Sequence, residues 1–131
     1  ALYLPRHLLG LEVATSILDS AGLGRSGYGE DYRPRQDLVA VARRDLAAGT
    51  VLSMGGHHHS IDGVGAEVRP AAGLAADRPA PFYLVADRPL VRSVRAAEAI
   101  RLGDVAIDSD SGLLAMRQRQ DALFGMADTP V

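Results

Sequence analysis

The chain contains Asp45-Leu46-Ala47-Ala48-Gly49-Thr50-Val51-Leu52 and repeats the pattern at Ser93-Val94-Arg95-Ala96-Ala97-Glu98-Ala99-Ile100, followed by Asp104-Val105. In both copies an aliphatic residue enters a turn of small residues and two aliphatic positions leave it, as expected for strands joined by a tight turn. A turn repeated within a small domain indicates an architecture rather than an isolated loop. Gly49 supplies a special backbone angle in the first copy. The second copy has Ala97 there, so its turn must differ or carry strain.

The composition sets the size and chemistry of the protein. Its 131 residues, 47% of them hydrophobic, are enough for one sizeable core, which must be built from small and aliphatic side chains because aromatic residues are only 5%. The sequence has no cysteine, which excludes disulfides and thiolate metal sites. A net charge of -2 gives no electrostatic reason to expect a nucleic acid or an anionic membrane as partner. Without a long apolar run or a leader pattern, we predict a soluble cytoplasmic protein.

Residues 1–36 are expected to form an N-terminal helix and a linker. Pro5 to Ser20 has helical periodicity with Gly22 as a stop, and its apolar line needs a surface to pack against, in this domain, a second copy or a catalytic domain. Ala21 to Gln36 is rich in Gly and Arg, typical of a linker. It includes Gly22-Leu23-Gly24-Arg25-Ser26-Gly27, which matches a dinucleotide fingerprint formally but follows a helix instead of a strand. We interpret these as linker glycines.

Residues 37–131 are expected to form the main domain. The sequence predicts strands at 38–42, 64–68 and 82–86, a loop at 70–81, and turns at Asp77-Arg78-Pro79 and Asp87-Arg88-Pro89. It also predicts a final helix over 109–126, capped by Ser109 or Asp110. This helix should have an apolar face with Leu113, Met116, Leu123 and Phe124, and a polar face with Arg117, Arg119 and Asp121.

Several of these segments together resemble the SAF superfamily of small β-clip domains, and most of all the C-terminal region of homoserine-dehydrogenase-like and deoxyxylulose-phosphate-reductoisomerase-like oxidoreductases. The resemblance rests on residues 5–12, 37–49, Gly55-Gly56, Asp104-Val105 and 120–124. It implies a mostly β (α+β), compact SAF-like β-clip domain with an N-terminal and a C-terminal helix. It also implies a small polar metabolite as substrate and a nucleotide-binding domain that precedes this segment in the relatives. NAD(P) would then reach the site only through a separate catalytic partner.

The most unusual segment is Gly55-Gly56-His57-His58-His59-Ser60-Ile61-Asp62-Gly63, which holds three of the four histidines. In an extended strand His57 and His59 share a face and His58 points away. A third metal ligand would come from Asp62, Glu67 or His7, and such a set suits a divalent metal such as zinc, iron or manganese. Alternatively the histidines line a pocket or act as acid and base without a metal, or lie on a solvated loop. Ser60 is the candidate hydroxyl nucleophile, Asp62 belongs to the same candidate catalytic cluster, and Glu67 is a candidate substrate-binding residue.

A second group of candidate residues lies near the start of the first helix. If this segment borders a shared active site, as the resemblance implies, Arg6 and His7 bind an anionic substrate. Arg6 would do so through two hydrogen bonds from its guanidinium, and His7 as a hydrogen-bond donor or acid-base group. The alternative is an ordinary surface pair. The other arginines, among them Arg92 and Arg101, alternate with acidic residues and are interpreted as a solvated mixed-charge surface.

Three functions follow as hypotheses. The first is the substrate-binding or assembly part of an oxidoreductase-type enzyme, with the loops around His57, His58, His59 and Asp62 facing the metabolite. The second is a self-sufficient lyase, isomerase or cyclase that uses this cluster with or without a metal. The third is a non-catalytic interaction module that binds a partner through the N-terminal helix. Partners are therefore a small polar metabolite, a catalytic subunit or a second copy of the chain.

Overall fold

A computed structural model describes residues 9–25, 32–56 and 59–126. The chain divides into two units, Ala1–Arg33 and Pro34–Val131. In the first unit, helix α1 spans Leu9–Leu23. Gly22 lies inside this helix, so the predicted stop at Gly22 is wrong. Gly24, with φ of 61°, ends it instead, and the Arg25 N–H donates to the Asp19 carbonyl at 3.2 Å.

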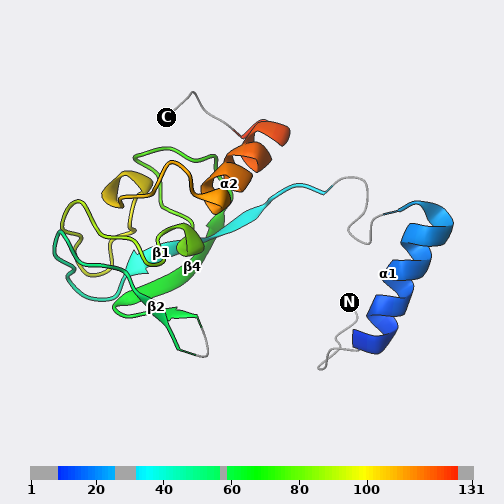
Figure 1. The fold of residues 1–131 in the computed structure, drawn as a ribbon, viewed down its shortest axis with the longest axis horizontal. Coiled ribbons are helices and arrows are strands. Elements are labelled where there is room, and N and C mark those ends of the chain that lie inside the picture. The colour runs from blue at the N-terminus through cyan, green and yellow to red at the C-terminus, as the bar shows by residue number, and fades with distance from the viewer. Residues whose placement is uncertain (1–8, 26–31, 57–58, 127–131) are drawn as a thin grey trace. The chain divides into compact units, whose positions relative to one another are not determined.

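The second unit is built on a four-stranded antiparallel sheet with the strand order β1-β4-β3-β2 (Figure 1). The long strands β1 (Gln36–Ala42) and β4 (Val64–Pro70) pair along their full length, with Val39 opposite Glu67. The short strands β2 (Met54–Gly55) and β3 (Ser60–Ile61) form a hairpin. The predicted strands at 38–42 and 64–68 are therefore confirmed, because β-branched residues in both runs favour a pleated, half-buried surface.

The two copies of the turn pattern lie against each other and exchange the same contacts. Leu46 and Val94 donate their N–H groups to each other's carbonyls, both at 2.9 Å. The Asp45 carboxylate accepts from the Ala96 N–H at 2.8 Å, and the Ser93 hydroxyl accepts from the Ala48 N–H at 3.1 Å. The sequence repeat is thus a structural repeat with an approximate two-fold relation. Two segments 48 residues apart in equivalent positions build one core.

The backbone of both turns adopts the left-handed conformation at equivalent positions. Gly49 has a φ of 83° and Ala97 a φ of 66°. Because an L-residue with a side chain is strained in this region, the strain predicted at Ala97 is present. The core that both turns frame is aliphatic: its largest fully buried side chains are Leu52, Val85, Leu90, Val94 and Ile100.

One predicted element is wrong, and another is confirmed with different ends. Residues 82–86 do not form a strand, because Pro81 cannot donate to a ladder and its carbonyl accepts from the Leu84 N–H at 2.9 Å, which starts the 3₁₀ helix η1 (Phe82–Leu84). The final helix α2 spans Gly112–Leu123, shorter than predicted, and its cap is Ser111, whose hydroxyl accepts from the Leu114 N–H at 3.3 Å. A second 3₁₀ helix, η2, spans Leu102–Asp104.

The two Asp-Arg-Pro segments do form turns, as predicted. The Arg78 N–H donates to the Ala75 carbonyl at 3.0 Å and the Arg88 N–H to the Val85 carbonyl at 3.3 Å. Together the sheet, the paired turns and α2 give an α+β fold.

Candidate functional site

The histidine-rich hairpin is described in part. His57 and His58, like Arg6 and His7, lie outside the described residues. His59 is exposed, has a φ of 51°, and its ring meets the Tyr83 ring edge-on with 6.3 Å between centroids. The Ser60 hydroxyl donates to the Gly55 carbonyl at 3.3 Å, within the same hairpin. This hydrogen bond closes the hairpin and gives Ser60 a structural role, so its predicted role as nucleophile stays a prediction.

The two predicted carboxylates are each engaged by an arginine. Asp62, whose side chain is 87% exposed, forms an ion pair with Arg44. Glu67 on β4 accepts from Arg69 at 3.2 Å. Within the described ranges no three His, Asp or Glu side chains gather as metal ligands. The predicted ligand set of His57, His59 and Asp62 includes a residue outside those ranges, so it stays a prediction.

Of the predicted linker glycines, Gly24 follows α1, Gly22 lies inside the last turn of the helix, which contradicts a linker position, and Gly27 lies outside the described residues. A pyrophosphate binds at the N-terminus of a helix, where free N–H groups point outward, and not at its carboxyl end. The described part of the fingerprint, Gly22 to Arg25, therefore lies at the wrong end of a helix for a dinucleotide.

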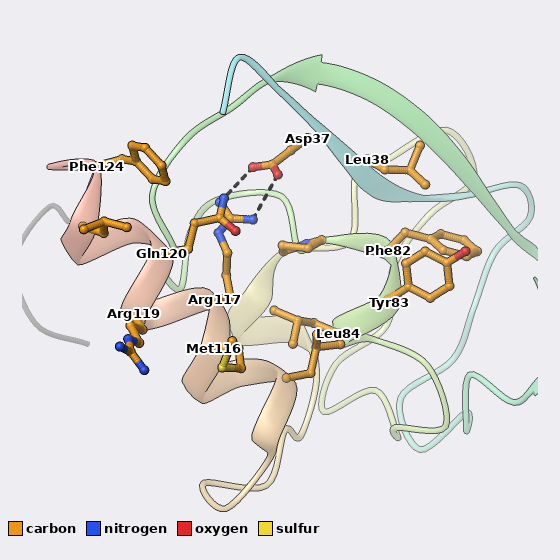
Figure 2. A pocket seen from close by; sticks show the side chains of 13 residues that line it. Asp37, Leu38, Phe82, Tyr83, Leu84, Met116, Arg117, Arg119, Gln120 and Phe124 are labelled. Atoms are coloured by element: carbon orange, nitrogen blue, oxygen red, sulfur yellow. Dashed lines mark hydrogen bonds and ion pairs between the residues drawn. The ribbon is translucent and has the colours of Figure 1, made fainter. Parts of the chain in front are cut away.

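A groove of about 470 Å³ opens between α2, η1 and the start of β1 (Figure 2). Apolar side chains from three elements line it: Leu38 of β1, Tyr83 and Leu84 of η1, and Leu113, Met116 and Leu123 of α2. Most of them are open to solvent, with Met116 64% and Leu123 77% exposed. Such a concave apolar surface is a candidate interaction site.

The wall of the groove is fixed by Arg117. Its guanidinium donates to both oxygens of Asp37, at 3.0 and 2.8 Å, and its Nε donates to Asp121 Oδ1 at 2.7 Å (Figure 2 shows the Asp37 pair). The other Asp121 oxygen accepts from the Leu74 N–H at 2.8 Å. Burial lowers the pKa of Arg117, but hydrogen bonds and charges of Asp121 and Asp37 outweigh it and raise that pKa. Arg117 stays charged and locks α2 onto the sheet.

This arrangement corrects the predicted faces of the helix. Arg117 and Asp121 were expected on a solvated polar face, yet they point inward and are nearly buried. The outward apolar positions are Leu113, Met116 and Leu123, joined by Gln120 at the groove. Their spacing of three and four residues is the one that helices use to pack against other helices. Arg119 borders the groove and, in the part of the chain described, its guanidinium has no ion-pair partner.

Tyr83 connects the predicted hairpin to the groove, since it lines the groove and contacts His59. Sequence reasoning missed the groove because its walls come from three segments far apart in the chain. The available signal was the apolar face of the last helix together with Phe82-Tyr83-Leu84.

Comparison with protein-family models and with curated proteins gives no match. In the described ranges, neither helix combines the length and apolar character that a membrane crossing requires.

Proposed function

We propose that this chain is the assembly part of an oxidoreductase-type enzyme that acts on a small polar metabolite, and that its domain is a SAF-like β-clip. The groove beside α2 receives a helix of the nucleotide-binding catalytic part, whether that part lies in the same polypeptide or in a partner subunit. NAD(P) would be held by the catalytic part. The chemistry named here follows from the family resemblance, and the docking follows from the groove.

The observation that carries the docking is the exposed apolar stripe of α2. Leu113, Met116 and Leu123 follow the spacing of a helix–helix seam, and Leu38 and Tyr83 extend the apolar surface beside them. A helix with matching aliphatic residues would cover this surface. An acidic residue at its flank would pair with Arg119, so we expect the docked helix to be apolar on one face and acidic at its edge.

Helix α1 supports the same role. Val13, Ile17, Leu18 and Leu23 are between 54% and 69% exposed. A helix of this length is marginal in water on its own, and a larger enzyme would supply a surface for it to pack against. The hairpin with His57, His58, His59 and Asp62 would then face the bound metabolite, with Arg6 and His7 at its anionic group. His59 reaches the groove through Tyr83, so docking would bring the catalytic part close to the hairpin.

A photo-cross-linking experiment tests the docking. A photoreactive phenylalanine analogue replaces Met116 in the groove, and in a control protein it replaces Gln118, which is exposed on the same helix but outside the groove. The protein is irradiated in its natural host in full-length form, and the cross-linked peptides are mapped by mass spectrometry. We expect position 116 to capture a helix of a nucleotide-binding domain and position 118 to capture none.

Two results would contradict the proposal. Equal capture at positions 116 and 118 would show that the groove is not the docking surface. Capture of a helix from a protein without a nucleotide-binding domain would support the interaction-module hypothesis instead.

A further inference from the structure

A second hollow, of about 770 Å³, lies apart from the groove, between the end of β4, the turn at residues 76–79 and the segment 98–104. In contrast to the groove it is polar. Three arginines and three acidic residues line it, on separate segments of the chain: Arg69, Arg92, Arg101, Asp77, Glu98 and Asp104. The local concentration of guanidinium groups is the feature that needs explanation.

The base of this hollow is rigid. Asp104 is 3% exposed, and its carboxylate accepts from Arg92 Nε and Nη2, the latter at 3.0 Å, and from the Arg101 N–H at 2.8 Å. The Gly103 N–H donates to the Ala76 carbonyl at 2.8 Å, and a Cβ at Gly103 would lie only 2.9 Å from that oxygen. The 3₁₀ helix η2 is therefore pressed against the turn, and a buried carboxylate holds the Arg92 guanidinium in one orientation.

The groups around this base have unused hydrogen-bonding capacity. A guanidinium has five N–H donors, and Arg92 spends two on Asp104. Within the described residues the Arg101 guanidinium has no ion-pair or hydrogen-bond partner, and neither has the Asp77 carboxylate. Donors of Arg92 and Arg101 and an acceptor at Asp77 thus line one hollow.

The repeat shows that the turn does not need the Arg101 side chain. In the first copy of the turn, Thr50 and Ser53 occupy the positions of Glu98 and Arg101. The backbone is nevertheless the same: the Thr50 N–H donates to Ala47 and the Glu98 N–H donates to Arg95, both at 3.1 Å. The Glu98 carboxylate accepts from the Arg95 N–H at 3.3 Å within its own turn, but the first copy makes the same turn with Ser53 at the position of Arg101, so the Arg101 guanidinium is there for a reason other than the turn.

We propose that this hollow binds a small organic anion that also carries hydrogen-bond donors, of the hydroxy-acid or amino-acid kind. Arg101 and Arg92 bind its carboxylate or phosphate group, because a guanidinium fork matches these groups with two parallel hydrogen bonds. Asp77 and Glu98 accept hydrogen bonds from its hydroxyl or ammonium groups. A simple dianion without donors would leave the Asp77 carboxylate without a hydrogen-bond donor and would be repelled by both carboxylates. The inference is independent of the proposed docking, because the two surfaces share no lining residue.

Isothermal titration calorimetry of the full chain with malate, succinate and inorganic phosphate, at matched ionic strength, tests this inference. We expect malate to bind more tightly than succinate, which lacks only the hydroxyl. Arg101→Gln removes the guanidinium group that is proposed to bind the carboxylate and leaves the contacts of Arg92 and Asp104 in place. It should weaken malate binding roughly tenfold. Asp77→Ala should abolish the preference for malate over succinate while both still bind.

The matched control is Arg44→Gln. Arg44 occupies in the first copy the position of Arg92 in the second and pairs with the exposed Asp62, outside the hollow. We expect its malate affinity to equal that of the natural chain. The proposal is overturned if none of the three anions binds, if Arg101→Gln binds malate unchanged, or if Arg44→Gln weakens binding as much as Arg101→Gln does.

Discussion

At the scale of single residues, the backbone at Ala97 stores strain that the equivalent Gly49 avoids. Ala97 has a φ of 66°. The left-handed conformation costs a residue with a Cβ about 1–2 kcal/mol. Glycine avoids this cost, but it loses more conformational entropy on folding than alanine does, which offsets part of the gain in stability. We expect Ala97→Gly to raise the free energy of unfolding by about 0.5–1 kcal/mol. Urea unfolding followed by circular dichroism measures it.

The reciprocal change is the control. A Cβ at Gly49 would meet no atom within 4 Å, so Gly49→Ala adds backbone strain alone. It should lower the free energy of unfolding by about as much as Ala97→Gly raises it. A destabilised Ala97→Gly variant would mean that the Ala97 methyl group contributes packing that outweighs the strain.

At the scale of elements, the position of α2 depends on one buried cation. Arg117 and Asp121 have side chains 10% and 4% exposed, and Asp37 pairs with the same guanidinium from β1. Arg117→Leu would leave two carboxylates buried without a counter-charge, which costs about 3–5 kcal/mol. We expect this variant to lose a large part of its stability in thermal unfolding. Arg119→Leu, on the same helix but exposed and unpaired in the described part, should change it by less than about 0.5 kcal/mol.

The elements also show what the sequence could predict. Strand β1, strand β4 and the two helices follow from local patterns of apolar residues, and the structure confirms them apart from their ends. The inward position of Arg117 could not be predicted, because its partner Asp37 lies 80 residues away in the chain. Phe82-Tyr83-Leu84 has strand-like composition, but Pro81 and the packing of Phe82 in the core decide for a 3₁₀ turn. Tertiary contacts override propensity at both places.

At the scale of the whole molecule, the repeated turn is the sequence pattern that predicts most about the fold. It predicted that two distant segments share one architecture, and the reciprocal hydrogen bonds of Leu46 and Val94 confirm this. The groove and the polar hollow were beyond prediction, since each is formed by several segments whose approach is set by the fold. The sequence favours a solvated surface for the arginines of the hollow, because it shows only that they alternate with acidic residues along the chain.

The approximate two-fold relation leads to a prediction about cooperativity. Leu52 and Ile100 occupy equivalent positions in the two copies, are 1% and 0% exposed, and belong to the same core. Truncation of either side chain to alanine leaves a cavity, so Leu52→Ala and Ile100→Ala should each cost about 2–5 kcal/mol. Because both copies contribute to one core, each variant should unfold residues 34–131 in a single transition. Far-ultraviolet circular dichroism and the fluorescence of Tyr83, measured with Tyr3, Tyr28 and Tyr32 replaced by phenylalanine, should give the same midpoint in urea. Separate midpoints in either variant would show that the two copies are stabilised independently, which the hydrogen bonds between Leu46 and Val94 argue against.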